Sequence, residues 1–92
     1  MLDAPSYPLL WQLSAQTRTP PEYFVAVMAS ESGLDPSRSN GVGFFGINQI
    51  CGAHSCDNTG GPGYLQRAGV DPQDYLTWSA SEQLARVVVP YF

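Results

Sequence analysis

Apolar residues recur at the spacing of an α-helix in two stretches near the start of the chain. In residues 6–16 and again in residues 20–32, they fall three and four positions apart, so each stretch would present one apolar face. The first face consists of Leu9, Leu10 and Leu13, with Tyr7 at its margin, and the second of Phe24, Val27 and Met28. The pattern therefore predicts two amphipathic helices that bury these faces.

The second stretch carries its own start and stop signals. Thr19 has the side chain of a good N-cap, Pro20 suits the first helical position, and Glu22 stands three residues after the cap, as in a capping box. Gly33 is a natural residue to end the helix, because it readily adopts the left-handed conformation found there. We expect a helix that begins at Pro20 and ends just before Gly33.

Glu31 continues the apolar face of this second helix, seven residues after Phe24. Partial burial would raise the pKa of its carboxyl group, and so would the negative end of the helix dipole. A carboxyl group with a pKa of roughly 6 can act as a general acid near neutral pH. The alternative is that Glu31 lies at the edge of the face and is solvated, and periodicity alone leaves both possibilities open.

After the second helix, the chain is expected to form long loops and short helices. Three closely spaced glycines follow, at Gly41, Gly43 and Gly46. They allow sharp turns or the close approach of a ligand. Residues 46–50 are expected to form a short helical turn that carries Gln49 toward Glu31.

The C-terminal third carries further helix signals. A short helix is expected near residues 64–68, and a capped turn near residues 71–74. A second capping box at Ser79 and Glu82 predicts a last helix through about Val89. Its buried face would consist of Leu84, Val87 and Val88. Together the elements predict an all-α fold, in one small domain that spans residues 1–92.

Charge and composition narrow the possible functions. The chain has no Lys, four basic and eight acidic residues, and a net charge of −4. This balance argues against a nucleic-acid partner, which would require a basic footprint. No apolar run approaches a membrane span, and the N-terminus lacks the basic segment of a signal peptide. The aromatic residues, which include five Tyr and two Trp, can fill a core or supply stacking surfaces for a sugar.

The segment ESGLDPSRSNGVGFFGINQI contains a recognisable pair of motifs. Glu31-Ser32 at the helix end is followed, without a gap, by Gly43 and by Gly46-Ile47-Asn48-Gln49. This arrangement resembles the catalytic segment of the soluble lytic transglycosylases and goose-type lysozymes. The resemblance covers roughly residues 20–52. Asn48 stands where the family usually has Met, Phe44 where it usually has Ala, and Asn40 where it usually has Ser.

The resemblance implies a small lysozyme-like helical domain that binds peptidoglycan glycan strands. Glu31 would be the single acid and base that cleaves the β-1,4 bond between N-acetylmuramic acid and N-acetylglucosamine, and the hydroxyl of the muramic acid would attack to leave a 1,6-anhydro product. Ser32 would orient Glu31, or simply bond to the helix backbone. The remaining site residues would bind substrate, with Gln49 either touching the sugar or bracing its loop. They are Asn40, Gly46, Ile47, Asn48 and Gln49. No metal or cofactor is implied.

The family also has a third motif, Ala-Tyr-Asn, which does not occur in this chain. We therefore expect the chain to match the N-terminal portion of the family fold, with the opposite wall of the cleft absent or supplied elsewhere. Without a signal peptide, the protein would be carried in a virion or delivered to the periplasm and cell wall by a phage or secretion assembly. Two alternatives remain, an inactive structural or interaction module and a hydrolytic lysozyme with a second carboxylate.

The segment CGAHSC holds both cysteines of the chain. Cys51 and Cys56 could form a disulfide that closes a short loop, or remain as free thiols. A zinc site that adds His54 and Asp57 is a third possibility, although structural zinc sites usually draw on two separated ligand pairs. No GxSxG motif accompanies the histidine, which argues against a serine hydrolase.

Overall fold

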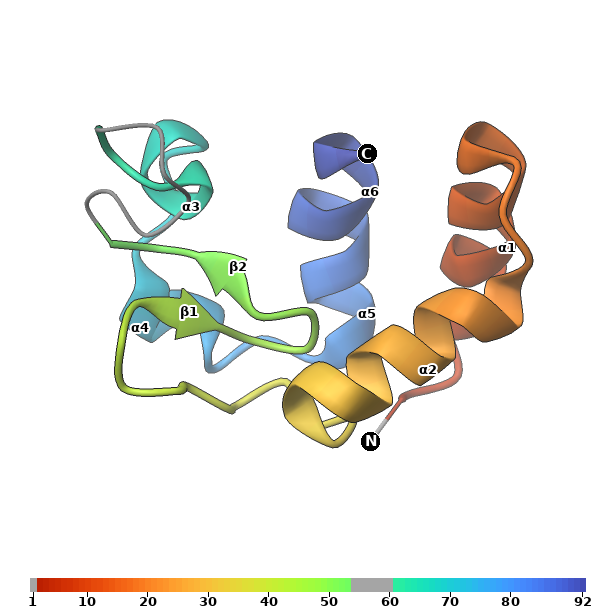
Figure 1. The fold of residues 1–92 in the computed structure, drawn as a ribbon, viewed down its shortest axis with the longest axis horizontal. Coiled ribbons are helices and arrows are strands. Elements are labelled where there is room, and N and C mark those ends of the chain that lie inside the picture. Colours follow the sequence, from red (N-terminus) through yellow and green to blue (C-terminus); the bar gives the residue numbers. More distant parts are fainter. Residues whose placement is uncertain (1, 54–60) are drawn as a thin grey trace.

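The computed structural model describes residues 2–53 and 61–92. The chain is mainly helical and carries a two-stranded antiparallel sheet (Figure 1). In chain order the elements are α1 (Ser6–Thr17), α2 (Pro21–Ser32), β1 (Phe44–Phe45), β2 (Ile50–Cys51), α3 (Tyr64–Arg67), α4 (Pro72–Tyr75), α5 (Ala80–Gln83), a π-helical segment (Leu84–Val88) and α6 (Val89–Tyr91). The last three elements run on without a break, and we call them together the C-terminal helix. No helix among the described residues combines the length and hydropathy needed to span a membrane.

Helix α1 confirms the first predicted helix. It ends where Arg18 adopts a left-handed conformation with φ of 55° and donates its N–H to the carbonyl of Ser14. Leu10 and Leu13 are buried, as the apolar spacing predicted. Tyr7, at the margin of the predicted face, is instead exposed.

Helix α2 confirms the second predicted helix, but its predicted start was wrong by one residue. The helix begins at Pro21, and the Thr19 hydroxyl donates to the carbonyl of Thr17 instead of capping the helix. Pro20 cannot be helical, because the ring of Pro21 forces the preceding residue into an extended conformation, seen here as ψ of 142°. The end matches the prediction, since Gly33 has φ of 65° and its N–H bonds the carbonyl of Ala29.

The prediction of an all-α fold missed a β-hairpin, and the helical turn expected at residues 46–50 is wrong. Strands β1 and β2 pair antiparallel, with Phe44 opposite Cys51 and Phe45 opposite Ile50. Residues 46–49 form the tight turn between them. Gly46 and Gln49 both have positive φ, of 84° and 50°, which a right-handed helical turn does not allow.

The C-terminal helix begins as predicted. The Ser79 hydroxyl accepts the N–H of Glu82, at 3.2 Å. The sequence did not predict the π-helical segment, in which the N–H of Val89 reaches back to the carbonyl of Leu84. Pro90 follows directly, and a proline has no N–H to donate and crowds the carbonyl four residues before it. The π-helical turn, which is wider than an α-helical turn, lies where an ordinary α-helix would bring the ring of Pro90 against that carbonyl.

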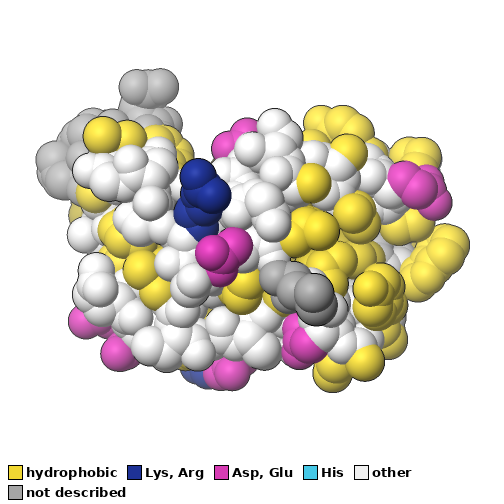
Figure 2. Space-filling model, turned by 90° about the horizontal axis from the view of Figure 1, so that it is seen from below, with side chains coloured by type: hydrophobic (Ala, Val, Ile, Leu, Met, Phe, Trp, Pro, Cys, Tyr) yellow, Lys and Arg dark blue, Asp and Glu magenta, His cyan; other side chains and the backbone are white. Residues whose placement is uncertain are grey.

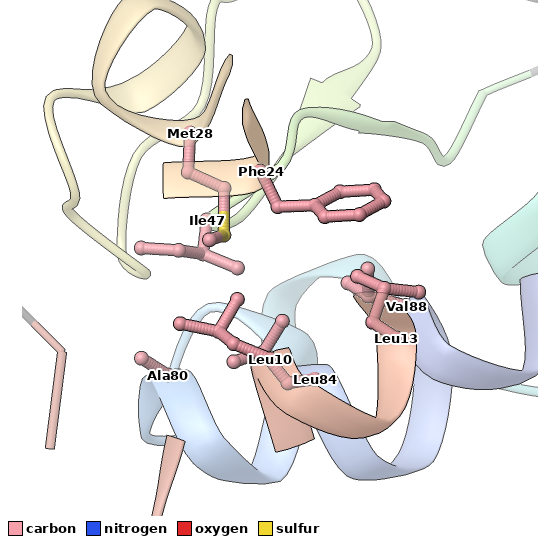
Figure 3. Packing of buried hydrophobic residues seen from close by; sticks show 8 residues of the cluster. All are labelled: Leu10, Leu13, Phe24, Met28, Ile47, Ala80, Leu84 and Val88. Carbon is pink, nitrogen blue, oxygen red and sulfur yellow. The ribbon is translucent and has the colours of Figure 1, made fainter. Parts of the chain in front are cut away.

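Two apolar clusters hold these elements together. The larger joins α1, α2, the hairpin turn and the C-terminal helix (Figure 3), through Leu10, Leu13, Phe24, Met28, Ile47, Ala80, Leu84 and Val88. The smaller ties the hairpin to α3, α4 and the same C-terminal helix, through Ile50, Leu65, Tyr75 and Val87. Because the hairpin contributes to both clusters, it is fixed against the end of α2.

Candidate functional site

A pocket of about 550 Å³ lies between the end of α2, the hairpin, α3 and α6. In Figure 1, α3 and the hairpin lie on one side of the C-terminal helix, and the end of α2 lies below them. The polar side chains among its described lining residues include those of Glu31, Asn40, Asn48 and Gln49. Four of the residues that the sequence assigned to a glycan site therefore meet at one pocket.

Glu31 lies at this pocket but is not buried. Its side chain is exposed, and within the described part of the chain it makes no hydrogen bond or ion pair. The buried face of α2 runs instead through Phe24, Met28 and Ser32, spaced four residues apart. Val27 and Glu31 lie beside that face and line the pocket. Of the two positions that the sequence left open for Glu31, the structure shows the exposed one at the edge of the apolar face.

Ser32 does not point into the pocket, so the expectation that it orients Glu31 is wrong. It is 1% exposed, and its hydroxyl lies 2.9 Å from the carbonyl oxygen of Met28 and 2.6 Å from that of Ile47. A hydroxyl has one proton to share between these acceptors. Ser32 therefore joins the end of α2 to the hairpin turn. Its bond to the helix backbone is the alternative that the sequence left open.

Gly46 and Ile47 also belong to the packing and not to the pocket lining. The Ile47 side chain is completely buried in the larger apolar cluster. A Cβ on Gly46 would lie 2.2 Å from the ring of Tyr75 and 2.8 Å from Oε1 of Gln83. Glycine is thus required here by the neighbouring ring and by its positive φ, and the expected substrate contact of both residues is not supported by their placement.

Asn40 and Gln49 line the pocket, and each also braces the loop before the hairpin. Oδ1 of Asn40 accepts the N–H groups of Val42 and Phe44, at 2.8 and 3.1 Å. Nε2 of Gln49 donates to the carbonyls of Gly46 and Arg38, at 2.9 and 3.1 Å. The loop-bracing role that the sequence left open for Gln49 is present.

Asn48 differs from these two amides. It follows the buried Ile47 in the hairpin turn and lines the pocket, and its side chain makes no hydrogen bond to a described residue. A carboxamide offers both a donor and an acceptor. Asn48 is therefore the described amide best placed to bind a ligand.

Aromatic side chains form much of the remaining wall. Tyr64 of α3 and Tyr91 of α6 meet edge to face, with ring centroids 4.7 Å apart. Phe92 contacts Tyr91 in the same manner, at 5.1 Å. Phe44 lines the pocket from the hairpin. The pocket thus combines a carboxylate, a carboxamide and several rings.

Sequence reasoning missed Gln83, which is completely buried although polar. Its Oε1 accepts the N–H of Ile47 at 2.8 Å, while Nε2 donates to the carbonyls of Pro36 and Tyr75 at 2.7 and 2.8 Å. The signal was available, because Gln83 stands one position before Leu84 on the same apolar face as Val87. A polar residue on such a face is buried and needs partners.

The electrostatics of the pocket are simple. Glu31 has the only carboxylate side chain among its described lining residues, and none of the arginines of the chain lines it. Cys51, which also lines it, is disulfide-bonded. The other residues of the predicted disulfide and zinc alternatives, His54, Cys56 and Asp57, lie outside the described residues. Elsewhere in the described chain, no group of three or more His, Cys, Asp or Glu is placed to hold a metal.

Comparisons with protein-family models, curated proteins and solved structures return no match. The site is therefore defined by its own geometry. An accessible carboxylate faces a hollow that is lined by a carboxamide and aromatic rings, which suits acid and base chemistry on a polar, ring-shaped ligand.

A second pocket, of about 410 Å³, lies between α1 and α2. It is lined mainly by apolar side chains, among them Leu10, Trp11 and Val25, and Glu22 is its one described charged residue. Figure 2 shows hydrophobic side chains gathered at the end of the molecule where these helices lie. Trp11 is 65% exposed there. The groove can bind an apolar surface but offers little for chemistry.

Proposed function

We propose that this chain is a lytic transglycosylase with a small lysozyme-like helical fold, which cleaves the β-1,4 bond between N-acetylmuramic acid and N-acetylglucosamine in peptidoglycan. One observation supports this most directly. Glu31 lies at a pocket of about 550 Å³ together with Asn48 and several aromatic rings. One or more residues from each of the two motifs that resemble those of the transglycosylases thus line the same pocket, although the motifs are separated in sequence.

In the proposed reaction, the Glu31 carboxyl group donates its proton to the glycosidic oxygen as the bond between that oxygen and C1 of the muramic acid breaks. A positioned general acid accelerates such a step by roughly 10² to 10⁴. A bound glycan would cover the exposed carboxyl group and exclude water from the reacting atoms.

The second half of the reaction returns the proton. The C6 hydroxyl of the muramic acid attacks C1, and its proton passes to the Glu31 carboxylate. The product is a 1,6-anhydro sugar, and the enzyme regains its acid. This route needs one carboxylate, whereas ordinary glycosidases use two. The described lining contains one carboxylate side chain, which favours the transglycosylase over a hydrolytic lysozyme.

Clearance of a suspension of purified peptidoglycan tests the proposal. The wild-type chain should clear the suspension, and Glu31→Gln should slow clearance by at least about 100-fold, the lower end of what a general acid contributes. Glu22→Gln is the matched control, because Glu22 is an exposed carboxylate at the other end of the same helix. Equal rates for wild type and Glu31→Gln would contradict the proposal.

The apolar groove favours a second candidate function, an inactive interaction module of a virion or secretion assembly. The exposed Trp11 and the apolar lining between α1 and α2 support it. Under this alternative the protein catalyses no reaction, so its function would need none of the described carboxylates. The two candidates differ in whether wild-type protein releases any soluble glycan fragment at all. In both, we propose that the protein acts at the cell wall after delivery by a larger assembly.

A further inference from the structure

The pocket at Glu31 carries a negative charge that nothing described at the pocket offsets. The chain has no Lys, and its arginines, at positions 18, 38, 67 and 86, do not line the pocket. The chain as a whole has a net charge of −4, which adds a weaker repulsion of the same sign. An anionic group that entered the pocket would therefore approach Glu31 with no cation among the described lining residues to neutralise it.

The other lining groups are neutral and suited to an uncharged sugar. The side-chain amide of Asn48 has no described partner, so it can bond an N-acetyl or hydroxyl group. The rings of Tyr64, Tyr91 and Phe44 provide apolar faces. Neither kind of group compensates a negative charge as an arginine or lysine would.

We infer that the pocket selects uncharged N-acetylated sugars and discriminates against muramic acid residues whose lactyl carboxylate is free. This inference rests on the proposed function, because it assumes that the pocket binds a glycan. Glycan strands whose lactyl groups are joined to peptide through an amide lack that charge. At the lactyl group such strands are the better ligands, and strands stripped of their peptides are the poorer ones.

A matched pair of ligands isolates the charge. The first is the disaccharide N-acetylglucosaminyl-β-1,4-N-acetylmuramic acid, which lacks the bond that the enzyme would cleave. The second is the same disaccharide with its lactyl group converted to the methylamide. The two differ at the lactyl group and chiefly in its charge, so their binding can be compared on the intact wild-type chain.

Binding is followed by NMR, with the side-chain amides of Asn48 and Gln49 as local reporters in the pocket. At about 20 mM salt the methylamide should bind about fivefold more tightly than the acid, and at about 200 mM salt the difference should shrink, because salt screens exposed charges. In Glu31→Gln the preference should fall below about twofold. Glu22→Gln, which changes the net charge equally, should retain it.

The outcomes separate this inference from the proposed function. If both disaccharides shift the Asn48 amide with equal affinity in the wild type, or if the acid binds more tightly, the inference is wrong while the glycan pocket stands. If neither ligand shifts the pocket amides, the glycan pocket itself is overturned, and the inference with it. If the preference survives unchanged in Glu31→Gln, the discrimination has another cause and the inference is again wrong.

Discussion

The side chain of Gln83 is bonded to the backbone of Ile47 through a hydrogen bond of 2.8 Å, between Oε1 of the glutamine and the N–H of the isoleucine. The carbonyl of the same Ile47 accepts a hydrogen bond of 2.6 Å from Ser32. A single residue in the hairpin turn is thus tied to the C-terminal helix on one side and to the end of α2 on the other. Asn48 follows Ile47 and Glu31 precedes Ser32 in the sequence, so both are positioned through these two bonds.

Replacing Gln83 by Leu should lower the free energy of unfolding by about 2–4 kcal/mol. The substitution leaves the N–H of Ile47 and the carbonyl of Pro36 without their partner, and unpaired buried groups cost about 1–3 kcal/mol each before relaxation. The carbonyl of Tyr75 also loses the Gln83 amide but keeps the N–H of Trp78, at 3.1 Å. Urea denaturation measures the loss. Gln12→Leu, on the exposed side of α1, is the control and should change stability little. An equal effect of both substitutions would contradict the structural role of Gln83.

Gly46→Ala and Gly41→Ala form a matched pair. Both glycines have positive φ, of 84° and 80°, but a Cβ at Gly46 would strike Tyr75 whereas nothing lies within 4 Å of one at Gly41. Gly41→Ala should cost about 1 kcal/mol through the backbone alone, and Gly46→Ala about 3 kcal/mol or more. Thermal unfolding of the two variants compares them directly. Similar midpoints would show that the contact between Gly46 and Tyr75 is not as close as described.

Ser32→Ala separates a packing role from a catalytic one. Loss of the hydroxyl should destabilise the protein by about 1–2 kcal/mol, because the buried carbonyls of Met28 and Ile47 lose its hydrogen bond. Clearance of peptidoglycan, measured well below the unfolding temperature, should stay within about threefold of wild type. A loss comparable to that in Glu31→Gln, with the fold intact, would mean that Ser32 acts on the carboxylate after all.

Asp3 makes stability depend on pH in acid. The hydroxyl of Ser81, with further hydrogen bonds from Ser6 and the Ser81 backbone, lowers the pKa of the Asp3 carboxyl from 3.8 to about 2. Because the folded pKa is the lower one, the stabilisation is present above about pH 4 and is lost as the pH falls toward 2.

The variant Asp3→Asn should therefore be less stable than wild type at pH 6, and the gap should narrow between pH 4 and pH 2. Chemical denaturation at several pH values measures it. Asp74→Asn, in the first turn of the separate helix α4, is the control. A gap between wild type and Asp3→Asn that stays constant down to pH 2 would show that the hydrogen bonds of Asp3 do not depend on its charge.

Local signals in the sequence were sufficient where one residue decides the structure. Gly33 ends α2 in a left-handed conformation, Asp71 caps α4 through the N–H of Gln73, and Ser79 caps the C-terminal helix. Each of these interactions lies within a few positions along the chain. The same holds for the apolar spacing that placed Leu13 and Met28 in the core.

The hairpin and the orientation of the site could not be predicted in this way. The strands have two residues each, too few for an alternating pattern, and they are supported by contacts such as the bridge between Ser39 and Phe45. Whether Ile47 or Asn48 faces the pocket depends on the buried partner of the turn, which is Gln83, thirty-six positions away from Ile47. The resemblance in sequence pointed to a segment that lines the pocket, but not to which of its side chains face it.

Mass analysis of the fragments released from purified peptidoglycan tests the central proposal most directly. If Glu31 is the single acid and base of a transglycosylase, wild-type protein will release fragments that end in 1,6-anhydro-muramic acid, and Glu31→Gln will release almost none. Fragments with free reducing ends would contradict the transglycosylase and indicate a hydrolase. The absence of any fragment from wild-type protein would contradict the enzyme itself and favour the interaction module.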